Sequence, residues 1–189
     1  MKVLLLDNYD SFTYNIFHYL RSNGVEVAVF RNDKISVENA MLYDAIVLSP
    51  GPGLPSEAGV MMDVIAAAHS SKPILGVCLG LQALVEYFGG SLKNLGKVIH
   101  GRSSLCFSVE NSILFENINS PFEVGHYHSW VADTIPKELI VTAKNEDELV
   151  MAIRHRSLPI EAVQFHPESV LTPEGKQMIK NWIDSIKNI

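Results

Sequence analysis

Short apolar runs alternate with amphipathic segments through the first half of the chain. The runs occupy residues 2–7, 25–30, 45–50 and 73–78. Helical spacing of apolar residues appears between them, at 11–24 and 56–70; in the first segment it is carried by Phe12, Ile16 and Leu20. Such alternation is typical of βαβ units. It predicts a parallel sheet that is covered by helices on both faces.

The second half has a different pattern, rich in strand-forming residues with short polar connections. Apolar and β-branched stretches lie at 104–109, 122–131, 139–145, 149–155 and 159–166. A final helix is predicted at 172–188, with Thr172 as its cap, Pro173 at its first position and a buried stripe made of Met178, Ile179, Trp182, Ile183 and Ile186. No linker divides the chain. We therefore predict one α/β domain over 1–189, an open, mostly parallel, flavodoxin-like sheet with an antiparallel β appendage.

Charge and composition narrow the classes of function. The 189 residues carry a formal charge of −6, which argues against a nucleic-acid groove because such grooves need basic patches. No run of 18 apolar residues exists, and the opening run of four is too short for a signal peptide. Two cysteines far apart in sequence suit neither a disulfide framework nor a zinc site. We expect a cytoplasmic protein without a metal or cofactor.

The stretch GVCLG at 76–80 has the pattern of a nucleophile elbow, with Cys78 in place of serine. The two glycines permit a sharp turn from a strand into a helix, and the helix N-terminus favours a thiolate. The interaction between a thiolate and the helix dipole is worth only about 0.3–1 kcal/mol. Strong activation therefore requires an imidazolium nearby. A buried, inert core cysteine is the alternative, but a core strand gains nothing from flanking glycines.

The stretch QFHPES at 164–169 supplies that partner. Pro167 holds the preceding His166 in an extended conformation, so His166 and Glu168 point the same way. A carboxylate beside an imidazole fixes its tautomer and stabilises its charged form, as in catalytic triads. A loop with both side chains in solvent is the alternative for this stretch alone.

The stretch SPGPG at 49–53 follows another predicted strand. Gly51 and Gly53 let the backbone approach a ligand, and its N–H groups could form an oxyanion hole with the N–H of Leu79. A phosphate loop is excluded because position 56 is serine and no Gly-Lys-Ser/Thr follows. In isolation the stretch could also be a plain turn. His126 and His128 lack further ligands, so we interpret them as strand residues.

Together these motifs resemble the class I (triad) glutamine amidotransferases. GVCLGLQ, SPGPG and QFHPES carry the resemblance, while DNYDSFTYN at 7–15 and KVIHGRSS at 97–104 narrow it to the glutaminase subunits of anthranilate synthase and aminodeoxychorismate synthase. The resemblance covers nearly the whole chain in order. One departure is Leu81, where this branch commonly has histidine, and another is Leu54 in the SPGPG segment.

The resemblance implies roles for particular residues. Cys78 would attack the carboxamide of L-glutamine, His166 would act as base and acid, and Glu168 would orient His166. Substrate contacts are implied for a further set: Gly51, Pro52, Gly53, Leu79, Gln82, Ser129 and Trp130. Ammonia would pass to a chorismate-using synthase chain of the anthranilate component I type.

Three functions remain open at this stage. The resemblance favours the glutaminase subunit for anthranilate, and hence tryptophan, synthesis. The alternatives are the corresponding subunit for aminodeoxychorismate, and hence folate, synthesis and a free-standing thiol γ-glutamyl hydrolase. A non-catalytic interaction module conflicts with the combination of an elbow and a His-Pro-Glu stretch. No nucleic-acid or membrane partner is expected.

Overall fold

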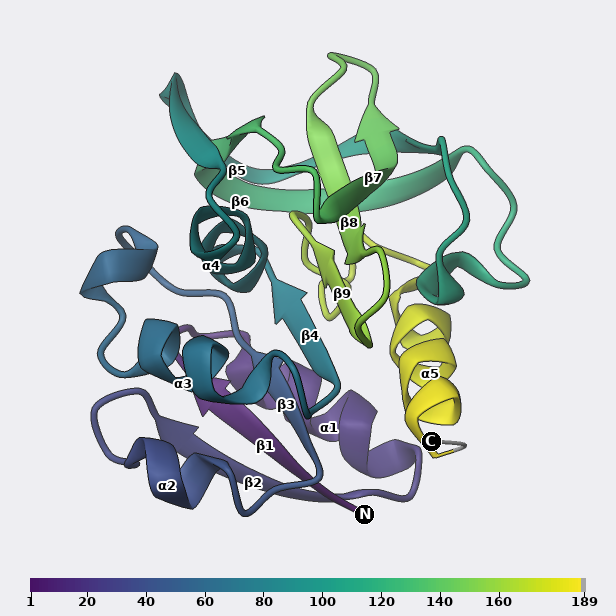
Figure 1. Cartoon of the computed structure of the whole chain (residues 1–189). Helices are drawn as coiled ribbons and strands as arrows, with labels where there is room; N and C mark the ends of the chain where they lie inside the picture. The colour runs from purple at the N-terminus through teal and green to yellow at the C-terminus, as the bar shows by residue number, and fades with distance from the viewer. Residues whose placement is uncertain (188–189) are drawn as a thin grey trace.

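The computed structural model describes residues 1–187, and within them the strands form one nine-stranded sheet (Figure 1). Its order is β2-β1-β3-β4-β9-β8-β7-β5-β6. The parallel part comprises β2 (Glu26–Arg31), β1 (Lys2–Asp7), β3 (Ala45–Leu48), β4 (Ile74–Val77) and β9 (Ile160–Val163). The antiparallel part comprises β8 (Val150–His155), β7 (Leu139–Asn145), β5 (Ser91–Ser108) and β6 (Phe122–Thr134). The predicted fold class is confirmed.

Helices cover both faces of the parallel strands. Alternate residues of β1 enter two separate cores: Val3 and Leu5 face one side, Leu4 and Leu6 the other, and all four are fully buried. The first core also receives α1 (Thr13–Ser22) and α5 (Gly175–Ile186). The second receives α2 (Val37–Ala40), α3 (Met61–Ala68) and α4 (Leu79–Tyr87). Burial of each large apolar side chain stabilises this arrangement by about 1.5–3 kcal/mol.

Two helix starts differ from the sequence prediction. The segment predicted as a helix from residue 56 forms a short 3-10 turn, η1 (Pro55–Glu57), and α3 begins only after Gly59, whose φ of 52° breaks the helical path. The last helix begins at Gly175 rather than after Thr172, although its predicted apolar stripe is buried. The Thr172 hydroxyl instead donates to the His166 carbonyl at 2.7 Å. Thr172 therefore ties down a loop and does not cap the helix.

The antiparallel appendage is dominated by the long β5–β6 ribbon. Its pairing is interrupted by register shifts between Asn94 and Ile99 and between His100 and Arg102. A second 3-10 turn, η2 (Ile113–Phe115), lies between the two strands in sequence and contacts α5.

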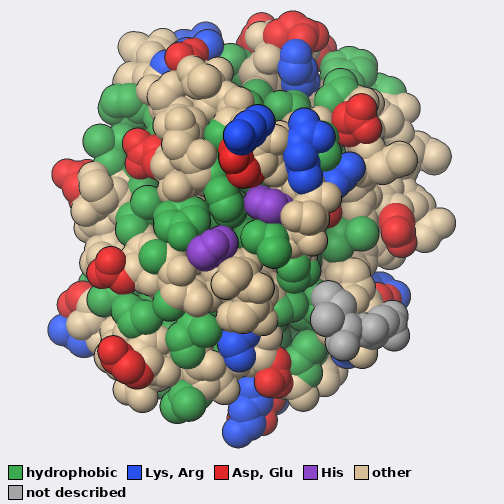
Figure 2. Space-filling model, viewed as in Figure 1, with side chains coloured by type: hydrophobic (Ala, Val, Ile, Leu, Met, Phe, Trp, Pro, Cys, Tyr) green, Lys and Arg blue, Asp and Glu red, His purple; other side chains and the backbone are tan. Residues whose placement is uncertain are grey.

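On the face drawn in Figure 2, acidic and basic side chains are interspersed. Across residues 1–187, no helix is long and apolar enough to cross a membrane.

Candidate active site

The carboxyl ends of β1, β3, β4 and β9 bring the sequence motifs to one edge of the sheet. The first two are joined directly, because the Asn8 backbone N–H donates to Ser49 Oγ at 2.8 Å and Asn8 Nδ2 donates to the Ser49 carbonyl at 2.9 Å. Ligands of open parallel sheets bind at this edge. A Cβ on Gly51 would lie only 2.5 Å from the Asn8 carbonyl oxygen, so only glycine permits this contact.

Cys78 occupies a strained corner between β4 and α4. Its φ of 53° and ψ of −100° are rare for a residue with a side chain and cost on the order of 1–3 kcal/mol. Its backbone N–H donates to the Val163 carbonyl at 2.8 Å. Close packing explains both glycines: a Cβ on Gly76 would lie 2.7 Å from the Gly80 carbonyl carbon, and one on Gly80 would lie 2.6 Å from the Leu48 oxygen. The predicted strand-to-helix elbow is present.

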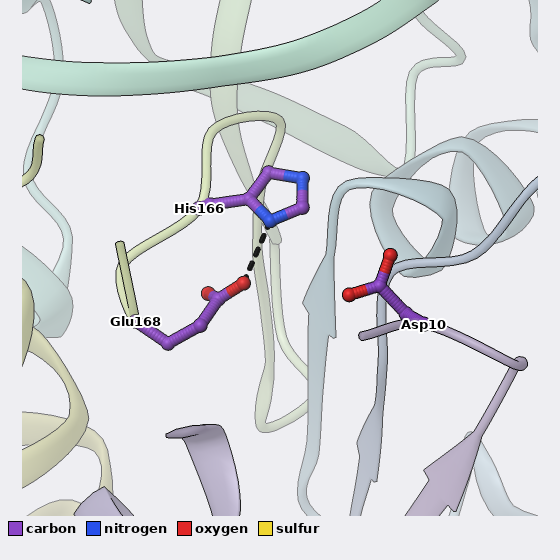
Figure 3. A group of neighbouring side chains, drawn as sticks. All are labelled: Asp10, His166 and Glu168. Carbon is purple, nitrogen blue, oxygen red and sulfur yellow. Dashed lines mark hydrogen bonds and ion pairs between the residues drawn. The ribbon is translucent and has the colours of Figure 1, made fainter. Parts of the chain in front are cut away.

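His166 and Glu168 form a buried pair after β9. His166 Nδ1 and Glu168 Oε1 are 2.6 Å apart, and both side chains are excluded from solvent (Figure 3). The rings of Phe12 and Tyr127 cover the imidazole, with centroids 5.7 and 4.9 Å from its own. Glu168 therefore fixes the tautomer in which Nδ1 carries the proton, and the aromatic rings limit the access of water.

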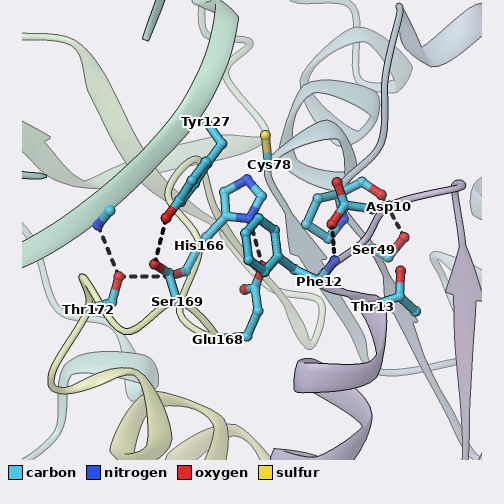
Figure 4. Close-up of polar contacts among 12 residues, drawn as sticks. Asp10, Phe12, Thr13, Ser49, Cys78, Tyr127, His166, Glu168, Ser169 and Thr172 are labelled. Carbon is cyan, nitrogen blue, oxygen red and sulfur yellow. Dashed lines mark hydrogen bonds and ion pairs between the residues drawn. The ribbon is translucent and has the colours of Figure 1, made fainter. Parts of the chain in front are cut away.

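The other nitrogen of His166 faces the cysteine. Nε2 is buried and has no hydrogen-bond partner within residues 1–187, and Figure 4 shows the Cys78 sulfur on that side of the ring. Burial alone would lower the pKa of His166, but the adjacent Cys78 and the hydrogen-bonded carboxylate of Glu168 outweigh that effect. Together they hold this pKa well above its usual value. The arrangement therefore favours the charged imidazolium form of His166 beside the Cys78 sulfur.

The loop that carries the pair is anchored on both sides (Figure 4). The Thr172 hydroxyl accepts the Gly125 N–H at 3.0 Å while it donates to the His166 carbonyl. The hydroxyls of Ser169 and Tyr127 are 3.1 Å apart. These contacts join the loop to β6, so the position of the imidazole depends on that strand.

A cavity of about 170 Å³ opens at the cysteine. It is lined by six of the seven residues predicted to contact substrate and by four others: Gly51, Pro52, Gly53, Cys78, Gln82, Val98, Tyr127, His128, Ser129 and Trp130. Leu79 is not among the lining residues but begins α4 directly after Cys78. Gln82 Nε2 donates to the Trp130 carbonyl at 3.0 Å and to Gln164 Oε1 at 3.2 Å. Its amide nitrogen is therefore already engaged.

The carboxylate of Asp10 lies near the His166–Glu168 pair. One potential metal-ligand atom from each of Asp10, His166 and Glu168 lies within 4.8 Å of the others (Figure 3). Asp10 Oδ1 also accepts the Phe12 N–H at 2.8 Å. A metal ion bound here would have to displace the short hydrogen bond between His166 and Glu168. The geometry thus fits an acid–base pair better than a metal centre.

The remaining candidates are a pair of histidines, of which His128 lines the cavity, and the second cysteine. His126 Nδ1 and His128 Nε2 are 3.1 Å apart, and Ser104 Oγ lies 2.7 Å from His126 Nε2. Burial lowers the pKa of His126 to about 4 and that of His128 to about 3. Burial likewise raises the pKa of Cys106 to about 12, so this second thiol is inert at neutral pH.

Sequence reasoning gave three neighbours of the site no role. Helical spacing places Phe12 in the buried stripe of α1, but it precedes the helix and meets the His166 ring edge to face. Tyr127 is hidden in a strand pattern. Gln164 belongs to the QFHPES stretch, and its amide lies 3.5 Å from the Cys78 sulfur. The sequence pattern around these three residues does not indicate that they lie at the site, because each reaches the site only through tertiary packing.

The family model for class-I glutamine amidotransferases matches residues 4–186. The chain belongs to this family. Anthranilate synthase component 2 of Haemophilus influenzae is 46% identical over 192 residues, which cover 99% of this chain and 98% of that protein. Aminodeoxychorismate/anthranilate synthase component 2 of Bacillus subtilis is 40% identical over 189 residues, with 98% of this chain and 97% of that protein covered.

Longer relatives and solved structures also match this amidotransferase chain. A multifunctional tryptophan biosynthesis protein of Phycomyces blakesleeanus is 45% identical over 188 residues, yet the chain spans only 24% of that protein. The crystal structure of a candidate GMP synthase protein from Thermoplasma acidophilum superposes with a TM-score of 0.90 at 26% identity. The match covers 100% of this chain and 94% of that one. Leu81, where a histidine was expected from the family, is fully buried in the apolar core.

Proposed function

We propose that this chain hydrolyses L-glutamine to glutamate and delivers the ammonia to a chorismate-using synthase chain that makes anthranilate. One observation carries the proposal: a strained, helix-capping Cys78 faces the free Nε2 of a buried His166–Glu168 pair. The names of the relatives from Haemophilus influenzae and Bacillus subtilis support the synthase context.

In the first half-reaction, the Cys78 thiolate attacks the carboxamide carbon of glutamine. The carbonyl oxygen becomes an oxyanion, for which the N–H of Leu79 and the backbone of the 51–53 segment are the candidate donors. The His166 imidazolium gives its Nε2 proton to the leaving nitrogen, and ammonia departs as the carbon–nitrogen bond breaks. The product of this step is a γ-glutamyl thioester on Cys78.

In the second half-reaction, water hydrolyses the thioester. Neutral His166 takes a proton from the water, whose oxygen forms a bond to the acyl carbon. The carbon–sulfur bond then breaks, which restores the thiolate and the imidazolium, and the new γ-carboxyl group releases its remaining proton to water as glutamate leaves. Glu168 keeps its charge throughout and stabilises the imidazolium in each half-reaction.

The cavity beside Cys78 would hold the substrate. Ser129 and Trp130 would contact glutamine through their backbone, and Gly51 to Gly53 would allow close approach from the opposite wall. Gln82 would use its Oε1 atom, because its nitrogen already donates to Trp130 and Gln164.

The rim of the site supports a partner chain. Three apolar or aromatic residues on or beside the segments that form the site are exposed: Val98 at 74%, Val170 at 93% and Tyr9 at 49%. Of these, Val98 lines the cavity, so a partner that covers the three would remove apolar surface from water and cover Val98 at the cavity. The cytoplasmic location expected from the sequence remains a prediction.

One alternative product has specific support. The relative from Bacillus subtilis carries both product names, so aminodeoxychorismate stays a candidate product. A free-standing γ-glutamyl hydrolase would use the same triad without a partner.

The decisive experiment combines the purified chain with each candidate synthase. Glutamine-dependent product and glutaminase rate are measured for the wild type, for Cys78→Ala and for the matched control Cys106→Ala. We expect Cys78→Ala to abolish glutamine-dependent synthesis and to retain synthesis from added ammonium, while Cys106→Ala retains both. Glutaminase activity in Cys78→Ala would overturn the assignment of the nucleophile. Full activity without any synthase, and no complex with one, would favour the free hydrolase.

A further inference from the structure

Two consecutive residues at the end of β9, Val163 within the strand and Gln164 just after it, hold the cysteine at both its backbone and its sulfur. The Val163 carbonyl accepts the Cys78 N–H at 2.8 Å, and Gln164 Nε2 donates to Cys78 Sγ at 3.5 Å, an ordinary distance for a sulfur acceptor. Gln164 is completely buried. Its backbone N–H donates to the Met151 carbonyl at 2.8 Å, so the residue is fixed at its main chain as well.

The orientation of the Gln164 amide follows from its neighbours. The Trp130 carbonyl can only accept a hydrogen bond, so the Gln82 atom 3.0 Å from it must be the nitrogen. That same nitrogen lies 3.2 Å from Gln164, which must therefore present its oxygen. The nitrogen of Gln164 is left facing the sulfur. Gln82 Nε2 thus donates in two directions, to the Trp130 carbonyl and to Gln164 Oε1, and Gln164 Nε2 donates in turn to Cys78.

We propose that Gln164 is the hydrogen-bond donor that holds the Cys78 thiolate in place for attack. This inference rests on the proposed role of Cys78 as nucleophile. His166 supplies the opposite charge, but it must leave the sulfur when it carries the proton to ammonia. The Gln164 amide does not give up its proton, so its N–H can stay hydrogen-bonded to the sulfur throughout. Gln82 is a positioning residue for Gln164 as well as a part of the cavity wall.

The size of the effect can be bounded. A hydrogen bond donated to the thiolate lowers the pKa of a thiol by about one to two units. Losing this donor should therefore move the pH at which the sulfur becomes reactive upward by at least about one unit. Below that pH, the fraction of thiolate, and with it the rate of alkylation, should fall about tenfold.

The experiment measures the rate at which iodoacetamide alkylates Cys78 between pH 5 and 10, read by mass spectrometry of the Cys78 peptide. It needs neither glutamine nor a synthase, so a failure of the proposed function would leave the result interpretable. Cys106 serves as an internal control because burial makes it unreactive. The test variant is Gln164→Met, which keeps the volume and removes the donor. The matched control is Gln177→Met on α5, where the amide donates to Asn181 Oδ1.

We expect the midpoint of the pH–rate profile to rise by about one unit in Gln164→Met and to stay unchanged in Gln177→Met. Gln82→Met should give a smaller rise, because Gln164 keeps its donor but loses its positioning partner. An unchanged midpoint in a folded Gln164→Met would overturn the proposal. If that variant does not fold, Gln164→Asn serves instead, since its shorter side chain withdraws the amide from the sulfur. An unchanged midpoint there would overturn the proposal equally.

Discussion

Replacing Glu161 by glutamine should stabilise the protein at alkaline pH. Glu161 is a buried carboxyl on β9, beside a cavity of about 820 Å³ lined in part by η2 and α5. Burial raises its pKa from 4.5 to about 7, although the Ser112 hydroxyl, 2.8 Å away, and the positive charge of Arg154 both oppose the rise. The folded state therefore disfavours the ionised form.

The magnitude follows from the pKa shift. In the unfolded chain this carboxyl ionises near pH 4.5, whereas in the folded chain it ionises near pH 7. Stability is therefore lost as the pH rises between these values and stays lower above them. A rise of about 2.5 units at ~1.36 kcal/mol per unit costs ~3 kcal/mol above pH 7. A neutral amide removes this cost and can still accept the Ser112 hydrogen.

The assay is urea unfolding of the wild type and Glu161→Gln at pH 5 and pH 8. We expect the variant to be more stable by up to ~3 kcal/mol at pH 8 and within about 1 kcal/mol of the wild type at pH 5. Glu110→Gln, an exposed carboxyl that lines the same cavity, is the matched control and should show no such difference. An equal effect of Glu161→Gln at both pH values would refute the assigned pKa.

Three further predictions concern the site and its surroundings. His166→Ala should lower the glutaminase rate by at least about 10²–10⁴-fold. Glu168→Gln should lower this rate less, and it should move the alkaline limb of the kcat/KM profile to lower pH because Glu168 helps to raise the pKa of His166. Gly80→Ala should lower both the melting temperature and the activity, since its Cβ would lie 2.6 Å from the Leu48 oxygen; an unchanged melting curve would contradict this. Burial lowers the pKa of His126 and His128, so unfolding free energy should fall as the pH drops from about 6.5 toward 4, and His128→Gln should flatten that dependence.

Local patterns were sufficient to predict the framework of the site. The parallel strands, the elbow at Cys78 and the pairing of His166 with Glu168 each follow from residues close together in sequence. The alternation of apolar runs predicted the strands, Gly76 and Gly80 predicted the elbow, and Pro167 predicted the His166–Glu168 pairing. Tertiary packing did not override these local signals. The same locality explains the errors. Thr172 has the chemistry of a helix cap, but its hydroxyl accepts from the Gly125 N–H, 47 residues away, and donates to the His166 carbonyl in its own loop.

The contacts that tune the site could not be predicted in this way. Phe12 lies at helical spacing from Ile16, yet the chain turns before α1 and sends its ring to His166. The contact between Gln164 and Cys78 joins residues 86 positions apart. It depends on how β4 and β9 lie side by side. Register between strands is set by the whole sheet, so no single stretch of sequence contains it.

The β5–β6 ribbon joins the proposed docking rim to the reacting groups. Val98 on β5 is exposed beside the cavity, and its neighbour Ile99 pairs with His128 on β6. On β6, Tyr127 packs against His166, and the Trp130 carbonyl holds the amide chain that leads to Cys78. A partner chain that presses on this ribbon therefore acts on both the base and the nucleophile through one strand. Since small misplacements of reacting groups can cost about 10²-fold in rate, docking at this rim would be sufficient to couple glutamine hydrolysis to the presence of the proposed synthase chain.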